Sequence, residues 1–404
     1  MRIAIEATCL RNRRGYGRHA RALFGALVAE NTHRYTFVTD EDPSTLDVPA
    51  GAEVLAVHNA ISSSEAIRAG GRRSLASMWR MSKALSRPEF EAVVFPSVFS
   101  YVPVWSRASK IVFQHDVIAE TFPELTTPAL AERCFWWMKC TAAQWQAERL
   151  VTVSEYSRVK IAERLGWPAS RIAVVGEAPA PVFRKLADPR LTPRLEATAI
   201  DWSRPMFVFV GGFSPHKNLP RLVEAFSRVV SAPPFQDLQL VLVGETRSET
   251  FLSGLAALRH ACSQYRIEDR TVFTGFLPDE DLTVLLNRAT ALVLPSLMEG
   301  YGLPAVEAAA CGAPVIATKE SPLPGILGDA GIYVSPGNTE EIAEALRLVA
   351  GSALVRARMR EGGIAACAVL NWPTQAKALL RLIAETKAGT REALKGNSTS
   401  WARI

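Results

Sequence analysis

The stretch EGYGLPAVEAAACGAPVIA (residues 299–317) decides how the second half of the chain folds. Pro304 suits the first turn of a helix, where the N–H that proline lacks would have no partner. Gly312 stands where a helix commonly ends in the left-handed conformation, and Pro314 follows it. The stretch therefore predicts a short helix, roughly residues 304–311, between two buried strands.

Short apolar runs alternate with helical patterns on both sides of this stretch. The runs expected as strands in the second half are MFVFVGG (206–212), LQLVLVGE (238–245), TVFTGF (271–276), TALVLPS (290–296), APVIAT (313–318) and GIYVSP (331–336). Those in the first half are MRIAIEA (1–7), YTFVTD (35–40), AEVLAVH (52–58), AVVFPS (92–97), KIVFQHD (110–116), RLVTVS (149–154) and RIAVVG (171–176). Strands that alternate with helices are typical of parallel βαβ units.

The pattern predicts an α/β chain of two successive doubly wound domains. We expect an N-terminal Rossmann-like domain at 1–183, a linker rich in proline and charge at 184–205, and a C-terminal Rossmann-like domain at 206–373. A helix and tail at 374–404 are expected to return to the first domain. Open parallel sheets bind ligands outside the carboxyl ends of their strands, so we expect the two domains to face each other across a ligand cleft.

Two carboxylates frame the helix predicted in the opening stretch. Glu299 lies on the loop after a strand, and Glu307 lies near the helix start. The free N–H groups and the dipole of a helix start favour an anion, and a carboxylate beside them would accept hydrogen bonds from sugar hydroxyls. A plainer interpretation stays open for each residue alone: Glu307 complements the dipole, and Glu299 is solvated.

A second loop with ligand-binding character follows the strand at 206–212. Its glycines, Gly211 and Gly212, let a ligand approach the backbone, and Lys217 at the start of a helix suits a phosphate. Asn218 is expected to cap that helix. The alternative is an ordinary strand–turn–helix connection with an exposed lysine.

Two loops of the first half carry similar signals. In CLRNRRGYGRHARALF, Gly15 and Gly17 lie in a basic loop that could cover a diphosphate, although the arginines could equally form a solvated face. In KIVFQHDVIAETFPE, His115 and Asp116 end an apolar strand. A neutral His115 could bond a substrate hydroxyl, with Asp116 orienting it, but a histidine at a strand end is often structural.

The composition excludes several classes of protein. The chain has 404 residues, 48% of them hydrophobic and 21% charged, which is a globular composition too long for one typical core. Its net charge of +6 fits anionic ligands or an anionic membrane surface. It lacks the dense basic blocks of a nucleic-acid-binding protein, so we expect no nucleic-acid partner.

Cysteine and acidic residues indicate a reduced chain without metal. The six cysteines form no CxxC pair, so we expect neither a zinc site nor a disulfide framework. MRIAIEATCL reads as a first strand rather than a signal peptide, which favours a cytoplasmic location. The segment DED (279–281) resembles a metal-binding DxD motif, but its position before LTVLLNRA favours helix capping.

Taken together, these motifs resemble those of the group 1 family of retaining glycosyltransferases, which have the GT-B fold of two Rossmann-like domains. The residues that carry the resemblance are GGFSPHKNLPRLVEAF and VLPSLMEGYGLPAVEAAACGAPVIAT, whose Glu299 and Glu307 match the E-x7-E signature of that family. RGYGRHARAL, QHDVIAETFPE, VTVSEYSRVKIAERLGWP and TVFTGFLPDEDLTVLLNRA extend it over most of the chain.

The resemblance implies roles for individual residues. A nucleotide-diphosphate sugar would be the co-substrate, with no cofactor and no metal. Glu307 would contact the ribose, Glu299 the donor-sugar hydroxyls, Lys217 the diphosphate and His115 the transferred sugar. The expected catalytic residues are Glu299, His115 and Lys217, and the expected donor-binding residues are Gly15, Gly17, Gly212, His216, Lys217, Phe276, Gly300, Tyr301, Gly302, Leu303 and Glu307.

The chain departs from the family pattern at Phe213. Many members have arginine at this position, so a diphosphate clamp here would depend on Lys217, with His216. The loop VVGEAPAPVF also lacks the usual Asn-Gly turn.

The resemblance predicts a retaining hexosyltransferase that acts in the synthesis of a bacterial-type surface polysaccharide. GDP-mannose is slightly favoured as donor, and the acceptor would be a glycan or a lipid-linked glycan. Two other classes remain alternatives: a nucleotide-sugar 2-epimerase, which shares the fold, and a non-catalytic nucleotide-sugar-binding scaffold.

A basic segment hints at a membrane-bound acceptor. The stretch IRAGGRRSLASMWRMSKALSRP (67–88) could form an amphipathic helix on an anionic bilayer, which would make the protein peripheral on the inner face of the cytoplasmic membrane. The alternative is an exposed helix with one packed stripe.

Overall fold

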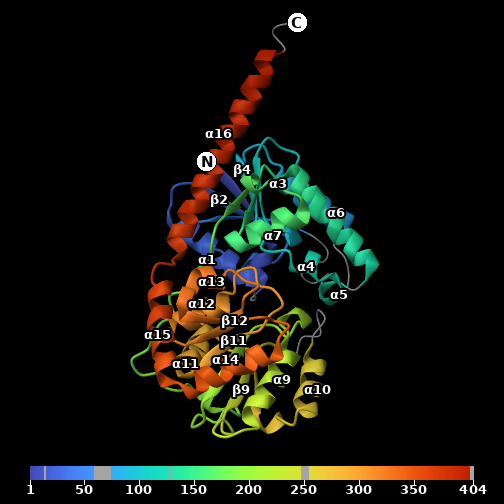
Figure 1. Cartoon of the computed structure of the whole chain (residues 1–404). Helices are drawn as coiled ribbons and strands as arrows, with labels where there is room; N and C mark the ends of the chain where they lie inside the picture. Colours follow the sequence, from blue (N-terminus) through green and yellow to red (C-terminus); the bar gives the residue numbers. More distant parts are fainter. Residues whose placement is uncertain (13–14, 59–73, 128, 247–253, 401–404) are drawn as a thin grey trace. The chain divides into compact units, whose positions relative to one another are not determined.

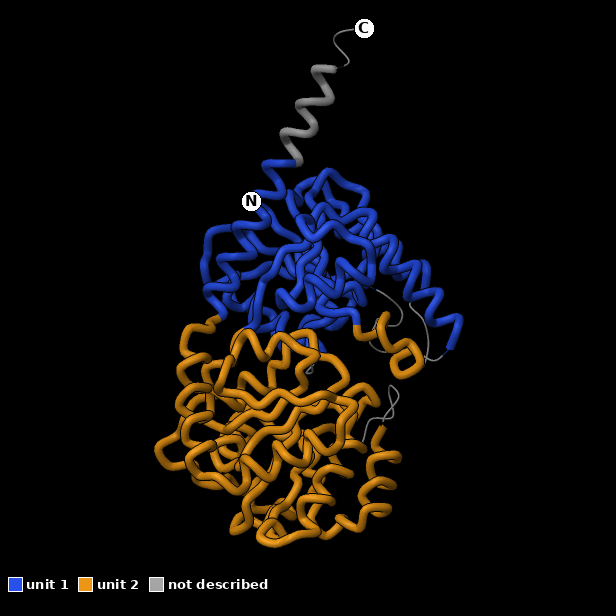
Figure 2. Tube along the Cα trace, viewed as in Figure 1, with its two compact units in different colours: residues 1–117, 129–177, 372–404 blue, residues 118–128, 178–371 orange. Residues whose placement is uncertain are grey.

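The computed structural model describes residues 1–12, 15–58, 74–127, 129–246 and 254–400 (Figure 1). The chain divides into two compact units (Figure 2). Unit 1 contains residues 1–117, 129–177 and 372–404, and unit 2 contains residues 118–128 and 178–371.

Unit 1 is built on a seven-stranded sheet with the order β3-β2-β1-β4-β5-β6-β7, in which all paired strands are parallel. Its strands are β1 (Arg2–Glu6), β2 (Arg34–Thr39), β3 (Glu53–Ala56), β4 (Ala92–Phe95), β5 (Ser109–Phe113), β6 (Arg149–Thr152) and β7 (Ile172–Val174). Its helices are α1 (Gly15–Ala29), α3 (Leu75–Leu85), α6 (Leu130–Gln146), α7 (Glu155–Leu165) and α16 (Trp372–Ser400).

The last helix of the chain belongs to the first unit. Helix α16 lies beside α1 and β5. Its Gln375 side chain accepts a hydrogen bond of 2.8 Å from the backbone N–H of Gly176. The expected return of the C-terminal segment to the N-terminal domain thus corresponds to α16.

Unit 2 is built on a six-stranded sheet with the order β10-β9-β8-β11-β12-β13, again parallel throughout. Its strands are β8 (Met206–Val210), β9 (Gln239–Val243), β10 (Thr271–Gly275), β11 (Ala291–Leu294), β12 (Val315–Thr318) and β13 (Gly331–Val334). Its helices are α4 (Ile118–Thr121), α5 (Pro123–Thr126), α8 (Pro193–Glu196), α9 (Leu219–Val230), α10 (Leu255–Gln264), α11 (Asp279–Arg288), α12 (Leu303–Ala310), α13 (Leu323–Leu327), α14 (Thr339–Gly351) and α15 (Ala353–Cys367).

The local patterns explain these elements. Strands β8, β9, β11 and β12 are buried at every position, as expected of parallel strands with helices on both faces. Helix α9 buries Leu222, Val223, Phe226, Val229 and Val230, a spacing that forms one apolar stripe. All thirteen strands read from the sequence are present, and the predicted fold class is confirmed.

Both sheets reverse their strand order beside their first strand. In unit 1 this switch lies between β1 and β4, and in unit 2 between β8 and β11. Doubly wound sheets bind ligands outside the carboxyl ends of the strands at such a point. In unit 2 the loops concerned are those after Val210 and Leu294, which carry Lys217 and Glu299.

The unit boundaries differ from the predicted domain limits, and residues 178–183 already belong to unit 2. The expected linker at 184–205 lies within unit 2, where the N–H of Leu186 donates to Asn287 Oδ1 at 2.9 Å. Residues 118–128, expected in the first domain, group with unit 2, and α5 lies beside the 3-10 turn Pro215–Lys217. Short polar connections lack the periodicity that would have revealed these contacts.

Candidate functional site

The loop between β11 and α12 requires glycine where α12 begins. Gly302 has a φ of 86°, in the left-handed region that other residues rarely adopt. A Cβ atom there would lie 2.9 Å from Cδ1 of Leu323. Gly302 therefore lets the chain turn sharply into α12, so that Gly300 and Tyr301 lie directly before the helix and Leu303 begins it.

Glu299 is a buried carboxylate paired with a lysine from the neighbouring loop. Its side-chain oxygen Oε1 lies 2.7 Å from Nζ of Lys217 and accepts a hydrogen bond of 2.5 Å from Oγ of Ser296. Only 6% of Glu299 is exposed. The structure thus joins two residues that lie 82 positions apart in the sequence. Ser296 was not predicted, because a serine after a strand carries no distinctive sequence signal.

Backbone and side-chain hydrogen bonds hold the loop after β8 and the loop after β11 together. The N–H of Leu297 donates to the carbonyl of His216 at 2.9 Å. The side-chain amide of Asn218 donates to the carbonyls of Pro295 and Pro336 at 3.1 and 2.8 Å. The prediction that the Asn218 side chain caps α9 is wrong: Asn218 stands at the N-cap position in the left-handed conformation, and its side chain ties the loops instead.

Lys217 and His216 differ in charge state. Burial, followed by the nearby Lys217 cation, lowers the pKa of His216 to about 4, so its imidazole is neutral at neutral pH. Its Nδ1 is buried and has no hydrogen-bond partner in the described part of the chain. Lys217 keeps 19% of its side chain exposed. The loop therefore offers one ammonium group and one neutral imidazole to a ligand.

Glu307 lies within α12, one turn after the helix start, and is only 1% exposed. The first N–H groups of a helix lack intrahelical partners and attract anions. These N–H groups follow Glu299 in the chain, and Glu299 pairs with Lys217.

Two further predicted positions of unit 2 follow strands of its sheet. Gly212 lies in the loop after β8, where an added Cβ would meet only Ser214 Oγ at 3.8 Å. Phe276 follows β10 and is 50% exposed. Phe213 is by contrast 5% exposed, with its ring centroid 6.3 Å from that of Phe209 and 6.0 Å from that of Phe273. The residue that departs from the family pattern is thus part of the aromatic core.

Gly15 and Gly17 lie in α1 of unit 1, not in an open loop as predicted. Helix α1 begins at Gly15. A Cβ atom at Gly17 would lie 1.8 Å from the carbonyl oxygen of Asn12, whereas one at Gly15 would meet nothing within 4 Å. Gly17 is therefore required by the close approach of the preceding turn of its own chain, a constraint that only the three-dimensional path reveals.

His115 lies directly after β5 in unit 1. Its Nε2 is 2.8 Å from the carbonyl oxygen of Pro96, and its own carbonyl accepts a bond of 2.9 Å from Thr152 Oγ1. Burial, followed by the neighbouring His19, lowers the pKa of His115 to about 4. The ring is thus neutral at neutral pH and held in one orientation, as a hydrogen-bonding contact to a substrate requires.

The acidic segment at 279–281 forms the first turn of α11 and does not supply its N-cap, which is Pro278. The carboxylate of Asp281 accepts a bond of 2.6 Å from Thr192 Oγ1 and pairs with Arg194 at 3.2 Å. The capping prediction is therefore wrong in detail: Asp281 joins α11 to α8.

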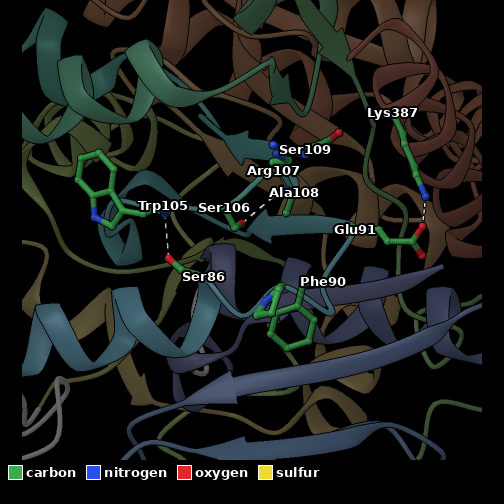
Figure 3. Close-up of a pocket in the computed structure, with 10 residues that line it drawn as sticks. Ser86, Phe90, Glu91, Trp105, Ser106, Arg107, Ala108, Ser109 and Lys387 are labelled. Carbon is green, nitrogen blue, oxygen red and sulfur yellow. Dashed lines mark hydrogen bonds and ion pairs between the residues drawn. The ribbon is translucent and has the colours of Figure 1, made fainter. Parts of the chain in front are cut away.

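A sizeable cavity of unit 1 lies away from these residues. It has a volume of about 520 Å³ and adjoins the starts of β4 and β5, near Trp105, Ser109, Glu91 and Lys387 (Figure 3). Glu91 forms an ion pair with Lys387. The predicted site residues of unit 1 follow the opposite, carboxyl ends of its strands, so this cavity is separate from them.

Comparisons with known proteins bear on the family and the fold of the chain. The family model described as "Glycosyl transferases group 1" matches residues 195–365. O-antigen chain mannosyltransferase B of Escherichia coli is 29% identical over 204 residues, or 49% of this chain and 50% of that protein. Serotype-specific mannosyltransferase WbdA of Escherichia coli is 29% identical over 187 residues, or 45% of this chain and 22% of that protein. The aligned region thus spans half or less of these curated relatives.

Solved structures resemble the chain over nearly its whole length. Sucrose-phosphate synthase from Thermosynechococcus elongatus has a TM-score of 0.76 and 18% identity, covering 96% of this chain and 99% of that one. WaaG, a glycosyltransferase involved in lipopolysaccharide biosynthesis, has a TM-score of 0.72 and 15% identity. The match covers 95% of this chain and 99% of WaaG. Anabaena HepE, solved with UDP and glucose, has a TM-score of 0.70 and 15% identity. The match covers 95% of this chain and 100% of HepE. Residues 195–365 thus match the group 1 glycosyltransferase family, and the chain has a GT-B fold.

Proposed function

We propose that the protein is a retaining, metal-independent hexosyltransferase that uses a nucleotide-diphosphate sugar, with GDP-mannose favoured as donor. The observation that carries the proposal is the contact of Lys217 with the buried Glu299, which Ser296 also bonds, at the switch point of the unit 2 sheet. A cation and a carboxylate fixed side by side suit a ligand that has both phosphate and hydroxyl groups. The mannosyltransferase relatives favour mannose as the sugar.

Glu299 can bind Lys217 and a hydroxyl group of the donor sugar at the same time. The contacts to Lys217 and Ser296 both use Oε1. Oε2 is then the oxygen that accepts a hydrogen bond from a donor-sugar hydroxyl. Because the carboxylate is buried, such a bond is stronger than it would be in water.

Lys217 and the start of α12 would stabilise the leaving diphosphate. Negative charge develops on the diphosphate as the bond from the sugar C1 to the phosphate oxygen breaks. Fixed donors directed at that charge lower the barrier without needing to reorganise. Glu307 would contact the ribose, and neutral His115 the transferred sugar. The acceptor hydroxyl would attack the same face of the sugar that the diphosphate leaves, which retains the configuration.

The donor assignment is tested with purified protein and a panel of UDP-, GDP-, dTDP- and ADP-sugars without added metal. We expect GDP-mannose to raise the melting temperature and to be slowly hydrolysed with release of GDP. Stabilisation by another donor alone would change the sugar assignment. Isomerisation of the bound sugar without release would identify a 2-epimerase, and no response to any donor, with or without glycan acceptors, would contradict a transferase.

The acceptor proposed is a glycan or lipid-linked glycan of surface-polysaccharide synthesis, and an exposed apolar face in unit 1 supports membrane contact. Helix α6 exposes one stripe of apolar side chains at helical spacing while burying Cys140 and Ala143. The stripe comprises Leu130, Cys134, Trp137, Met138 and Trp145. A helix that leaves such a stripe uncovered fits an interface with lipid.

Further exposed aromatic and basic residues adjoin the end of α6. Gln146 accepts a bond of 2.9 Å from the N–H of Val104, and the N–H of Trp105 donates to Ser86, just after α3, at 2.8 Å. Trp105 is 72% exposed and Trp79 of α3 is 64% exposed. The basic side chains Arg80, Lys83 and Arg107 are also exposed. Tryptophan beside cations suits an anionic bilayer.

The helix expected at 67–88 is described only in part. Helix α3 covers Leu75–Leu85 and buries Met81 and Leu85, with Leu75 and Trp79 exposed. Arg72 and Arg73 lie outside the described residues. None of the described helices is long and apolar enough to cross a membrane.

Co-sedimentation with vesicles tests membrane contact. We expect binding to vesicles that contain anionic lipid, weaker binding to neutral vesicles, and loss of binding in a Trp137→Ser/Trp145→Ser double variant. Leu354→Ser, at an exposed position of α15, is the control and should bind like the wild type. Equal sedimentation of the two variants, or dimers in solution that dissociate in the double variant, would assign the α6 stripe to another partner.

A further inference from the structure

Three side chains of types that can bind a metal ion meet at the carboxyl edge of the unit 1 sheet, from distant parts of the chain. His19 lies on α1, His115 follows β5, and Glu177 follows β7. One donor atom from each lies within 4.8 Å of the other two. Among the residues that the structure describes, this is the only group of three or more histidine, cysteine or acidic side chains arranged in this way.

The environment of His19 points to a missing ligand. The residue is 1% exposed, and its Nδ1 lies 2.9 Å from Oε1 of Glu177. Neither ring nitrogen has a well-oriented hydrogen bond in the described part of the chain. Buried polar groups normally have such partners, so an imidazole in this position calls for another explanation. A metal ion bound to the ring would provide one.

His115 has the orientation typical of a metal-binding histidine. When its Nε2 donates to the carbonyl of Pro96, at 2.8 Å, Nδ1 carries the lone pair. A backbone carbonyl on the second ring nitrogen commonly fixes the orientation of a ligating histidine. The ring centroids of His19 and His115 are 4.9 Å apart and nearly perpendicular, at 86°. The ring centroids of Phe113 and Trp372 lie 5.5 and 5.6 Å from that of His19.

We propose that His19, His115 and Glu177 bind a divalent transition metal of the zinc class, and that the bound ion inhibits sugar transfer. Two imidazoles and one carboxylate form a ligand set that zinc accepts, with a fourth position left for water. Ligands about 2.0–2.1 Å from a tetrahedral ion lie about 3.4 Å apart, so closure on the ion requires shifts of about 1 Å. His115 is the half-buried member, so the ion enters beside it.

The inhibitory consequence rests on the proposed function. There, neutral His115 contacts the transferred sugar, and an ion bound to its lone pair would remove that contact. The metal would therefore not assist the reaction, which depends on Lys217 and α12 in unit 2. It would make transfer sensitive to the concentration of free zinc.

Direct binding is measured first, with chelator-treated protein freed of any affinity tag. Zn²⁺ is titrated in competition with a chromophoric indicator, and Co²⁺ is added separately to report coordination by its visible absorption. We expect one ion per chain and a Co²⁺ spectrum typical of nitrogen and oxygen ligands.

Variants then assign the site. His19→Gln and Glu177→Gln should each weaken zinc binding more than tenfold, since loss of even an outer-sphere partner costs 10–100-fold. His260→Gln, which removes an exposed histidine on α10, is the matched control and should bind like the wild type. Equal binding by all four proteins, or no binding by the wild type, would overturn the proposal and leave the contact of His19 with Glu177 as a purely structural one.

Anomalous diffraction at the zinc edge tests the site without any variant. A peak between the three side chains of the zinc-soaked wild type is expected, and a peak only elsewhere would contradict the assignment. Zinc should also inhibit transfer by the wild type more than by Glu177→Gln, each relative to its own metal-free rate. Zinc binding without transfer from any donor would refute the proposed function and leave the metal site standing.

Discussion

Glu299 and Lys217 hold each other in place, so neither can be changed without consequences for its partner. Replacing Glu299 by glutamine keeps the size of the side chain and removes its charge. We expect turnover to fall at least tenfold while the fold survives, because Lys217 loses its counter-charge and the sugar loses a charged acceptor. Steady-state kinetics with circular dichroism check this, and Glu361→Gln, an exposed glutamate on α15, is the control. An unchanged rate would mean that Glu299 does not contact the donor.

Lys217→Ala tests the cation in the same way. Loss of a hydrogen bond to a charged group costs about 1.5–3 kcal/mol, which corresponds to at least a tenfold loss in kcat/KM for the donor. The variant also leaves Glu299 buried beside Ser296 alone. We therefore expect reduced thermal stability together with reduced donor use, and the double variant Lys217→Ala/Glu299→Gln should recover part of the stability. A stable single variant with normal donor use would contradict both expectations.

His216 should make folding stability depend on pH. Its pKa is lowered from 6.5 to about 4 in the folded protein, chiefly by burial. Between those values the unfolded chain binds the proton first, so the free energy of unfolding falls as the pH drops from about 6.5 to 4. The limiting loss is of the order of 3 kcal/mol. Urea titrations at several pH values should show a flatter profile for His216→Gln, whereas His260→Gln should follow the wild type.

The residues at the site were only partly foreseeable. Glu299, Lys217 and His216 could be predicted because glycines, a proline and a helix start surround them in the sequence. Ser296 could not, since its bond to Glu299 depends on the loop path. The Asn218 side chain was misassigned for the same reason: a residue in the left-handed conformation, with φ of 58°, directs its amide to other loops instead of to its own helix.

Helix α12 depends on the backbone geometry of its first residues. We expect Gly302→Ala to destabilise the protein by about 1–3 kcal/mol, because φ is 86° and the new Cβ would meet Leu323. Thermal unfolding measures this. Gly325→Ala is a matched control in the neighbouring helix α13, where a Cβ meets nothing within 4 Å, and should be neutral or slightly stabilising. Equal stability of the two variants would show that α12 can also begin when residue 302 adopts another backbone conformation.

Strands proved more predictable than helix ends. Parallel strands covered on both faces appear as continuous apolar runs, and that signal is local. Capping is decided by which atoms come close in space. Pro278, not the acidic segment, therefore precedes α11, and Asp281 pairs with Thr192 and Arg194 of a distant segment.

The stability of unit 1 depends on α16, which comes from the other end of the chain. Leu379 is fully buried in this helix, which lies beside α1. We expect Leu379→Ala to lower the free energy of unfolding by about 2–5 kcal/mol, the usual cost of a cavity in a core. Leu354→Ala, at an 81% exposed position, is the matched control and should have almost no effect. A similar small change in both would mean that α16 is not part of the core of unit 1.

The sequence by itself determined two parallel α/β domains and the residue types available at their carboxyl edges, because apolar periodicity and turn residues act over a few positions. Tertiary structure alone decided which of those residues meet. It paired Lys217 with Glu299 across 82 positions, placed Phe213 in the core, and brought His19, His115 and Glu177 together from three segments. Strand order in a doubly wound sheet sets these distances, and that order is a property of the folded chain rather than of any local pattern.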